Sequence, residues 1–273
     1  MSGPQPQKPN KALELLQKGM AELMGSESWK AALEVRAKLH AYSFNNCFLI
    51  QLQRPDATMV AGFNRWRDLG RQVRKGEKGI AILAPLTRKQ EENGEERRLL
   101  FGFRTAHVFD VSQTDGEPIA EPPRPELLEE DGEGIREAIA RLERYAESRG
   151  SRVERREVGA ALGTFHRLTK AITLRPDLPP LQTLKTLVHE LAHAILHAET
   201  TPGEQRHTRE LEAESCAYVV CHSLGLDTSR YSFAYLASWA EDAAELMPAG
   251  ERAVKAADEI LGALAAPGLE RAA

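Results

Sequence analysis

The sequence is poor in cysteine and lacks long apolar runs, and each shortage excludes a class of protein. Its three cysteines, Cys47, Cys216 and Cys221, have no C-x-x-C spacing, so neither a disulfide framework nor a cysteine-bound zinc site is predicted. No segment reaches the ~20 consecutive apolar residues that cross a bilayer, and the first ten residues contain no secretory h-region. We therefore expect buried thiols, no membrane partner and a cytoplasmic location.

Charge is distributed unevenly along the 273 residues, which are more than one compact domain usually contains. Residues 54–89 have nine cationic and three anionic side chains, whereas residues 115–134 have eight acidic and one basic. The acidic stretch also holds four prolines, a composition that favours extended, solvated backbone. We therefore predict two domains, 1–116 and 134–273, joined by an acidic linker at 117–133.

The first half combines helical and strand patterns. Ser28 and Ser43 are suited to cap two helices, and Gly70 to end a third. Two apolar runs are separated by a polar stretch with the turn pair Asn93-Gly94, which predicts a β-hairpin. The predicted helices cover residues 28–42, 44–53 and 63–69, and the predicted strands cover 80–85 and 99–111. This half is therefore predicted to be an α+β domain.

The second half is also predicted to be α+β. Its central feature is a long helix that opens at Pro180 and carries an apolar stripe from Leu181 to Ile195, so it should lie against a core. The next helix starts either at a capping box, 201–204, or nearer Thr208, and ends at Gly225. The other predicted elements are helices at 134–148, 232–247 and 251–264 and strands at 152–158 and 171–174.

The strongest chemical signal is His189-Glu190-Leu191-Ala192-His193, an H-E-x-x-H pattern on the long helix. Residues four apart share a helical face, so both imidazoles can reach one ion at roughly 2.0–2.1 Å. Glu190 is rotated about 100° from His189, which directs its carboxylate toward a water on the metal. A chance match or a structural zinc site are the competing interpretations, but a structural site would leave Glu190 without a role.

A catalytic zinc needs a third protein ligand, and the following helix offers three carboxylates. Glu210 and Glu214 share one face, whereas Glu212 lies about 200° around from Glu210 and should point elsewhere. We assign Glu210 as the ligand and Glu214 as the acceptor that holds the ring N–H of a ligand histidine. His197 continues the four-residue series, but its Cα lies ~12 Å along the axis from that of His189, so we leave it out of the ligand set.

Several stretches resemble known families. HELAHAILH (189–197) with ELEAESCAY (210–218) is similar to the glutamate-ligand zincins, especially the ImmA/IrrE-like peptidases and the C-terminal domain of ArdC-type antirestriction proteins. SFNNCFLIQLQRPDATMVAGFNRW (43–66), LGRQVRKGEKGIAI (69–82) and VFDVSQTDG (108–116) resemble the ArdC-type N-terminal single-stranded-DNA-binding domain. The resemblance implies zinc ligands at His189, His193 and Glu210, with Glu190 as catalytic acid and base.

The cationic composition of the first half suits the single-stranded DNA partner that this resemblance implies. Single-strand binders combine a cationic groove with aromatic side chains on which bases stack. For any one residue, a place in the core or on a solvated surface is the better interpretation; only the joint pattern favours DNA. The candidate contacts are Tyr42, Asn45, Asn46, Gln51, Arg54, Phe63, Arg65, Trp66, Arg71, Arg74, Lys75 and Lys78.

The sequence therefore favours a zinc metalloendopeptidase fused to a single-stranded-DNA-binding domain and acting on DNA-associated proteins. The resemblance to ArdC-type proteins implies that it is an antirestriction or mobile-element factor. The protein substrate is not identified by the sequence. Tyr218 and His207 both lie near the ligand segment and are candidates for stabilising the oxyanion. Two alternatives stay open: a non-proteolytic single-stranded-DNA-binding antirestriction protein with a structural zinc site, and an ImmA/IrrE-like regulatory protease that cleaves a repressor.

Overall fold

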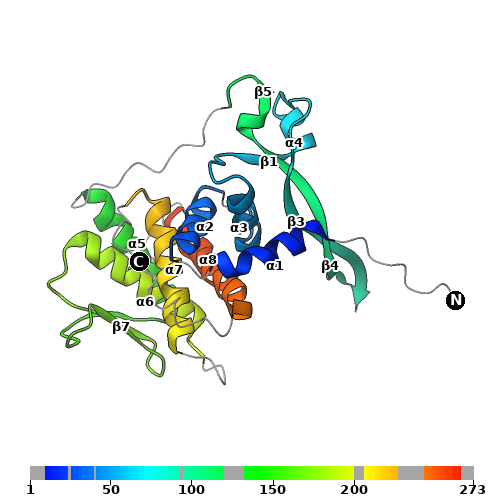
Figure 1. Ribbon diagram of the computed structural model, residues 1–273. Coiled ribbons are helices and arrows are strands. Elements are labelled where there is room, and N and C mark those ends of the chain that lie inside the picture. Colours follow the sequence, from blue (N-terminus) through cyan, green and yellow to red (C-terminus); the bar gives the residue numbers. More distant parts are fainter. Residues whose placement is uncertain are drawn as a thin grey trace. The chain divides into compact units, whose positions relative to one another are not determined.

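The structure is a computed structural model that describes residues 10–23, 26–39, 41–92, 95–119, 132–199, 206–226 and 243–265. The chain divides into two compact units, Met1–Ala120 and Glu121–Ala273 (Figure 1). This division falls within the predicted acidic linker, most of which, residues 120–131, lies outside the described residues. Both units combine helices and sheets, which confirms the predicted α+β class.

The first unit packs helices against a three-stranded antiparallel sheet in the order β1-β4-β3. Helices α1 and α3 contact the sheet, and α2 packs on α3. A two-stranded sheet, β2-β5, lies beyond the end of β4. The elements are α1 (Lys11–Leu23), α2 (Ser26–Lys38), α3 (Phe44–Gln53), β1 (Val60–Gly62), α4 (Phe63–Asp68), β2 (Arg71–Val73), β3 (Ile80–Glu92), β4 (Glu95–Asp110), η1 (Val111–Gln113) and β5 (Thr114–Gly116).

Helix α3 is capped as the sequence predicts, since the Ser43 side chain accepts a hydrogen bond from the Asn46 backbone N–H. The cap predicted at Ser28 is wrong. Helix α2 begins at Ser26, where Glu27 in the first turn favours an earlier start through its interaction with the helix dipole. Helix α1 has no counterpart among the predicted elements. All three cysteines are buried, as expected.

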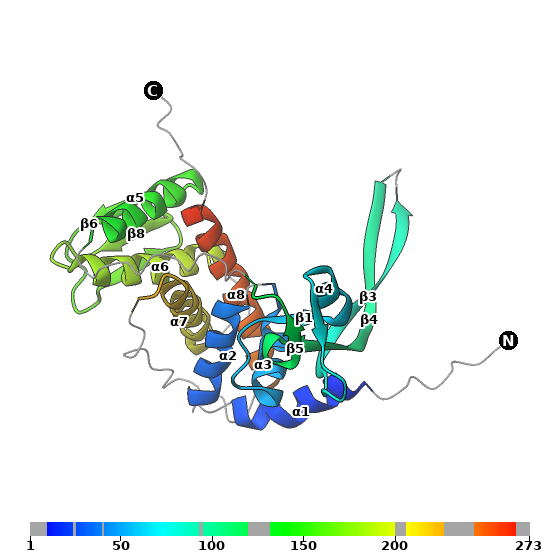
Figure 2. The ribbon, with the colours of Figure 1, turned by 90° about the horizontal axis from the view of Figure 1, so that it is seen from above.

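The predicted hairpin is confirmed, but its strands are longer than expected. The last register pair joins Glu92 to Glu95, so the predicted turn, residues 93–94, lies outside the described residues. Figure 2 shows this arm of β3 and β4 extending beyond the helices of its unit. The polar residues between the two predicted strands continue the ladder, because hydrogen bonds between main chains do not require apolar side chains.

The second unit is organised around helix α6. Strands β7 and β8 contact α6, as do helices α5, α7 and α8 (Figures 1 and 2). The sheet has the order β6-β8-β7, with β6 parallel and β7 antiparallel to β8. The elements are α5 (Glu133–Ser148), β6 (Val153–Arg155), β7 (Gly163–His166), β8 (Ala171–Leu174), α6 (Pro180–Leu196), α7 (Arg206–Ser223) and α8 (Ala243–Ala265).

The apolar stripe of α6 is buried at Leu184, Leu187, Val188 and Leu191, as predicted. Helix α7 begins at Arg206, nearer to the second of the two predicted starts, and the capping box at 201–204 lies outside the described residues. Strand β7 was not predicted. Within the part of the chain that the structure describes, no helix combines the length and apolarity needed to cross a bilayer.

The two helices predicted near the C-terminus form one helix where they are described. Helix α8 continues through Pro248, where the sequence predicts a break; residues 232–242 lie outside the described residues. An interior proline costs about 3 kcal/mol. Leu246, Met247 and Val254 are buried on either side of it, and each buried side chain of this size contributes about 1.5–3 kcal/mol. Burial therefore offsets the cost of the proline.

Asp110 joins the end of β4 to the segment that precedes β1. It is 1% exposed, and its carboxylate accepts backbone N–H groups of Thr58 at 2.8 Å, Met59 at 3.1 Å and Ser112 at 3.0 Å. Burial alone would raise the pKa of Asp110, but these hydrogen bonds outweigh it and hold the pKa below its usual value. The carboxylate is therefore stabilised in its charged form.

We predict that Asp110→Asn lowers the free energy of unfolding of the first unit by about 1–3 kcal/mol at pH 7, because the amide NH₂ faces backbone donors. The folded-state pKa lies below the unfolded value of about 3.9, so this stabilisation is complete above that value and is lost as the pH falls through the folded-state pKa. Urea unfolding of both proteins should show a difference that shrinks in acid; equal stability at pH 7 would contradict the assignment.

Candidate metal centre

Helices α6 and α7 bring together three potential ligands. His189 and His193 lie one turn apart on α6, and Glu210 lies on the facing helix α7. The two Nε2 atoms are 3.2 Å apart, and Glu210 Oε2 lies 3.7 Å from each. Among the described residues, these three form the one group of potential metal ligands whose donor atoms all lie within 4.8 Å of one another. Donors on a tetrahedral ion with ~2.0–2.1 Å bonds are roughly 3.3–3.4 Å apart, so the group fits a small divalent cation.

The three side chains are electrostatically coupled. Burial alone would lower the pKa of His189, but the nearby carboxylates of Glu210 and Glu214 raise the pKa to about 10. Burial lowers the pKa of His193. The two nearby imidazoles, each 3.7 Å from its carboxylate, hold the pKa of Glu210 far below its usual value. The group therefore offers one firmly anionic carboxylate, and a cation that binds there has to displace a proton from His189.

The outer nitrogens of both histidines are also hydrogen-bonded. The structure places Glu214 where the sequence predicts it, with Oε2 3.1 Å from Nδ1 of His189. Nδ1 of His193 lies 3.0 Å from Nδ1 of His197. His197 is thus outside the ligand set, as predicted, but it supports a ligand through a contact that the sequence did not predict. The signal was its position four residues after His193, on the same helical face.

Beyond His197 lies a buried carboxylate. His197 Nε2 is 2.9 Å from Glu212 Oε2, and these side chains are 2% and 1% exposed. The other oxygen of Glu212 accepts a hydrogen bond from Arg252 Nε on α8, at 2.8 Å. Glu212 points away from the ligand group, as its place on the helix predicts. Its function as the acceptor behind His197 could not be read from the sequence, because Arg252 lies on another helix.

These contacts permit one order of donors and acceptors. Nε2 of His193 must lack a hydrogen to bind a cation, so Nδ1 carries it and donates to Nδ1 of His197. Nε2 of His197 then carries a hydrogen and donates to Glu212, which also accepts from Arg252. Arginine has no hydrogen-bond acceptor, so the direction of the hydrogen bond between Arg252 and Glu212 cannot reverse. This series of hydrogen bonds therefore sets the tautomer of His193.

Glu190 is held against strand β7. Its side chain is buried, and burial raises the pKa to about 7 against the opposing effects of the His189 charge and the Phe165 backbone N–H. A Cβ at Gly163 would lie 2.6 Å from Thr186 Cγ2 and 3.1 Å from Glu190 Oε1. A glycine at 163 therefore lets β7 approach α6 closely enough for the Phe165 N–H to reach the carboxylate. The contact is not predictable from the sequence, because the pattern of residues 163–166 does not indicate strand β7.

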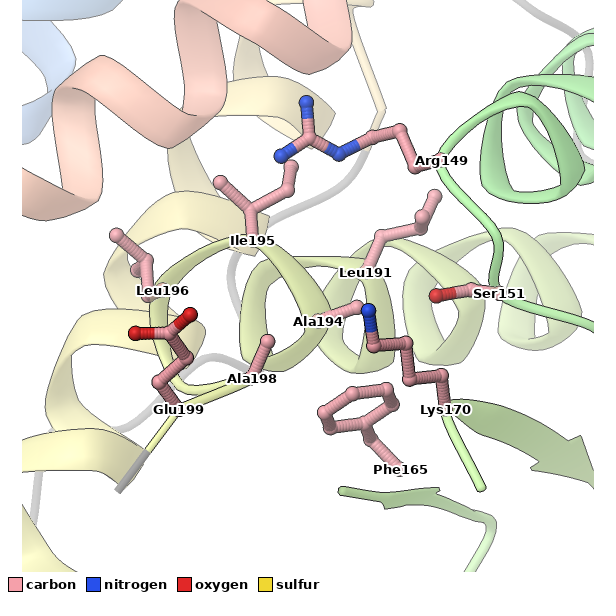
Figure 3. Close-up of a pocket in the computed structure, with 10 residues that line it drawn as sticks. All are labelled: Arg149, Ser151, Phe165, Lys170, Leu191, Ala194, Ile195, Leu196, Ala198 and Glu199. Atoms are coloured by element: carbon pink, nitrogen blue, oxygen red, sulfur yellow. The ribbon is translucent and has the colours of Figure 1, made fainter. Parts of the chain in front are cut away.

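A pocket of about 390 Å³ lies on the other side of α6. By the helical repeat, Leu191, Ala194 and Ile195 lie on the face of α6 opposite the metal-site histidines. Figure 3 shows these residues with Phe165, whose ring lines the pocket while its N–H bonds to Glu190. The two oxyanion candidates differ in burial: Tyr218 is 2% exposed and stacks on His222 at 5.9 Å, whereas His207 is half-buried.

Several predicted DNA contacts have structural partners. Trp66 is fully buried and its Nε1 donates to the Phe109 carbonyl, so its proposed role as a stacking surface is wrong. Hydrogen bonds also bind the side chains of Tyr42 to Val60 O, Asn46 to Leu83 N and O, Arg71 to Thr114 and Gly116, and Arg74 to Glu77 and Ser112. These polar groups therefore link elements of the first unit by hydrogen bonds.

The other candidates differ in exposure. Phe63 is 54% exposed on α4. Arg65, Lys75 and Lys78 are exposed, and Asn45, Gln51 and Arg54 are half-buried. The structure thus assigns some of the predicted side chains to contacts within the first unit and leaves Phe63, Arg65, Lys75 and Lys78 exposed at its surface.

The two units match two different family models. Residues 10–109 match the N-terminal domain of anti-restriction factor ArdC. Residues 146–231 match the IrrE N-terminal-like domain, a peptidase M78 model. The chain joins an ArdC-type N-terminal domain to an IrrE-like domain. The resemblance seen in the sequence motifs is therefore confirmed, and it implies a relationship to metallopeptidases for the second unit.

Solved structures with this architecture are known. The Mn(II)-bound crystal structure of the antirestriction ArdC protein from the R388 plasmid is similar with a TM-score of 0.63 and 20% identity, covering 94% of this chain and 99% of that one. The metal-free structure gives 0.54 and 22%, covering 81% and 84%. At these identities the likeness establishes the fold. An uncharacterized pXO2 protein of Bacillus anthracis is 30% identical over 77% of this chain, which spans 42% of that relative.

The donor order behind His193 yields a prediction for Glu212→Gln. The amide oxygen of the glutamine should face Arg252, so its NH₂ would donate to Nε2 of His197. His197 would then donate from Nδ1 to Nδ1 of His193, and the hydrogen of His193 would lie on Nε2. We expect metal affinity to fall about 10- to 100-fold, the usual effect of losing such a partner. Chelator competition with Zn²⁺ or Mn²⁺ measures the affinity, and histidine ¹⁵N shifts report the tautomer.

Glu259→Gln is the matched control, because Glu259 is a partly exposed carboxylate of the same unit that pairs with Arg149. It should bind metal like the unmodified protein. Circular dichroism checks that both variants fold. An unchanged metal affinity and His193 tautomer in folded Glu212→Gln would show that this series of hydrogen bonds does not set the tautomer of His193.

Proposed function

We propose that the chain is a zinc-dependent peptidase joined to a single-stranded-DNA-binding domain, and that it acts in antirestriction on proteins associated with DNA. The observation that carries the peptidase proposal is the place of Glu190, a buried carboxylate with a pKa of about 7 beside the group of His189, His193 and Glu210. Two imidazoles and one carboxylate are the ligand set of a family of catalytic zinc sites. Zinc held there supplies a Lewis acid that polarises the scissile carbonyl.

Glu190 is suited to move a proton in both directions. A general base works best when its pKa is near the operating pH, and burial brings the pKa of this carboxylate to about 7. It can therefore accept a proton from the attacking water and pass it to the leaving amine. The Phe165 N–H keeps the carboxylate in place at the edge of β7, and Gly163 provides the space for this contact.

Strand β7 offers a surface for the substrate. It is an end strand of the sheet β6-β8-β7, so among the strands that the structure describes one of its edges has no partner strand. Extended peptides bind to such edges through main-chain hydrogen bonds. We propose that the substrate pairs with β7, which would place its backbone beside Glu190. The protein substrate would then be recognised in an extended or locally unfolded segment.

The DNA-binding part of the proposal is supported by the first unit. It matches the N-terminal domain of ArdC and contains the cationic stretch found in the sequence. The R388 ArdC protein is described as antirestriction, and we extend that role to this chain. An alternative is a non-proteolytic DNA-binding protein with a structural metal site; it is favoured by the buried network that already joins α6, α7 and α8.

Glu190→Gln separates these functions. We predict that it lowers peptide-bond hydrolysis by about 10²- to 10⁴-fold, the usual contribution of a general base, and that metal and DNA binding are retained. Transfer of an unmodified plasmid into a restricting host, with and without the variant, measures antirestriction. The exposed Glu199 provides the control Glu199→Gln. Full antirestriction by metal-loaded, folded Glu190→Gln would defeat the peptidase proposal and favour the non-proteolytic one.

A further inference from the structure

A cationic pocket of about 610 Å³ lies within the first unit. It is formed where the start of α1, the end of α3, the start of β3 and the last part of β4 meet. Of the residues that line it, three are lysine or arginine, one is histidine and none carries a carboxylate. The lining residues are Lys11, Gln53, Arg54, Lys78, Gly79, Ile80 and His107.

The side of the pocket at α1 is fixed by hydrogen bonds to β4. The Asn10 side chain donates to the Phe103 carbonyl at 3.0 Å and accepts from the Thr105 hydroxyl at 2.8 Å. The Ala12 backbone N–H also donates to Thr105, at 3.2 Å. The first turn of α1, with Lys11 at its start, is thereby held beside the sheet. The positive end of the α1 dipole adds to the potential of the lysine.

Gln53 and Gly79 shape the rest of the pocket. The Gln53 amide bonds to both the N–H and the carbonyl of Ala81, each at 2.9 Å, so it is locked against β3. A Cβ at Gly79 would lie 2.8 Å from His107 Cβ and 3.2 Å from Phe109 Cζ. Glycine therefore allows His107 and Phe109 to lie side by side over this part of the strand.

The carboxylates near the pocket are balanced by arginines. Asp56 lies 3.9 Å from Arg54, and Glu77 pairs with Arg74 at 2.8 Å and accepts a hydrogen bond from Gln113 at 3.0 Å. The exposed ammonium groups of Lys11 and Lys78 add further positive charge at the pocket. The pocket therefore has an excess of positive charge and is suited to an anion.

An aromatic surface begins at the edge of the pocket. The Phe109 ring, which lies beside His107 at Gly79, makes an edge-to-face contact with Phe63 at 6.4 Å between ring centroids. Phe63 is 54% exposed on α4. Cations for phosphates beside an exposed ring for a base are the two components of single-strand recognition. A duplex would not offer its base faces to this ring.

We propose that this pocket binds a phosphate of single-stranded DNA and that a neighbouring base stacks on Phe63. The inference rests on the DNA-binding part of the proposed function and gives it a location. It assigns Lys11 and His107, which the sequence pattern did not include, and retains Arg54, Lys78 and Phe63 from the predicted set. Trp66 and Arg74 are left out of the site, because their side chains are hydrogen-bonded within the first unit.

The phosphate contact is tested on the full chain by fluorescence anisotropy with labelled oligo-dT over a salt series. Each phosphate contact to a single strand contributes a slope of about 0.7 to log K against log salt. We expect Lys11→Ala and Lys78→Ala each to reduce the slope by about 0.7 and to weaken binding about fivefold at 0.1 M salt. Arg88→Ala is the control, since Arg88 is an exposed cation on β3 that does not line the pocket. It should change neither quantity.

The stacking contact is tested with Phe63→Leu and Phe63→Tyr. Leucine keeps an apolar side chain without a π-face, and tyrosine keeps the ring. We expect leucine to weaken oligo-dT binding roughly 5- to 150-fold, as the loss of a base–aromatic stack does, while tyrosine binds like the unmodified protein. Binding of a matched duplex should be little affected by either change. Equal loss in both variants would overturn the stacking role.

Three results would overturn the pocket assignment. Lysine variants that behave like Arg88→Ala, while the protein still binds DNA, would show that the phosphates lie elsewhere. Inorganic phosphate that binds as tightly as the oligonucleotide would identify a site for a free anion. If the unmodified protein does not bind DNA, the DNA-binding part of the proposed function itself fails. The peptidase part is measured separately and is not affected by these outcomes.

Discussion

The interface between α6 and α7 requires that every buried ionisable group find a partner, and the arrangement of the second unit follows from this. Charged or polar groups removed from water are costly unless they are hydrogen-bonded. Glu214 faces one histidine of the ligand group, His197 faces the other, and Glu212 and Arg252 complete the series. Packing of α8 against α7 is thus coupled to the geometry at His193, although Arg252 is far from the ligands along the chain.

The sequence predicts the centre of this site well and its surroundings poorly. His189, Glu190 and His193 follow from a local pattern, because helical periodicity alone places them. Glu210 and Glu214 follow from the same periodicity on the next helix, once a resemblance to the zincins supplies the context. The links through Arg252 and Phe165 could not be predicted, because they depend on how separate helices and strands pack.

In the first unit, prediction from the sequence is limited in a different way. Composition identifies a cationic region but does not say which cations face solvent. Arg71 and Arg74 use their guanidinium groups to join β2, β5 and the adjacent loop, whereas Lys11, in a helix that was not predicted, reaches the anion pocket. Similarly, Phe63 and Trp66 belong to one short helix, yet one ring is exposed and the other is fully buried. Tertiary contacts decide between these roles.

The position of Arg252 on the last described helix has a consequence for how related genes are judged. A shortened homologue that stopped after α7 would keep H-E-x-x-H and the glutamate of the second helix, and a motif search would score it as intact. It would nevertheless leave a buried carboxylate without its counter-ion beside the imidazole that supports a ligand. A complete C-terminal helix is therefore needed, in addition to the motif, to support this ligand.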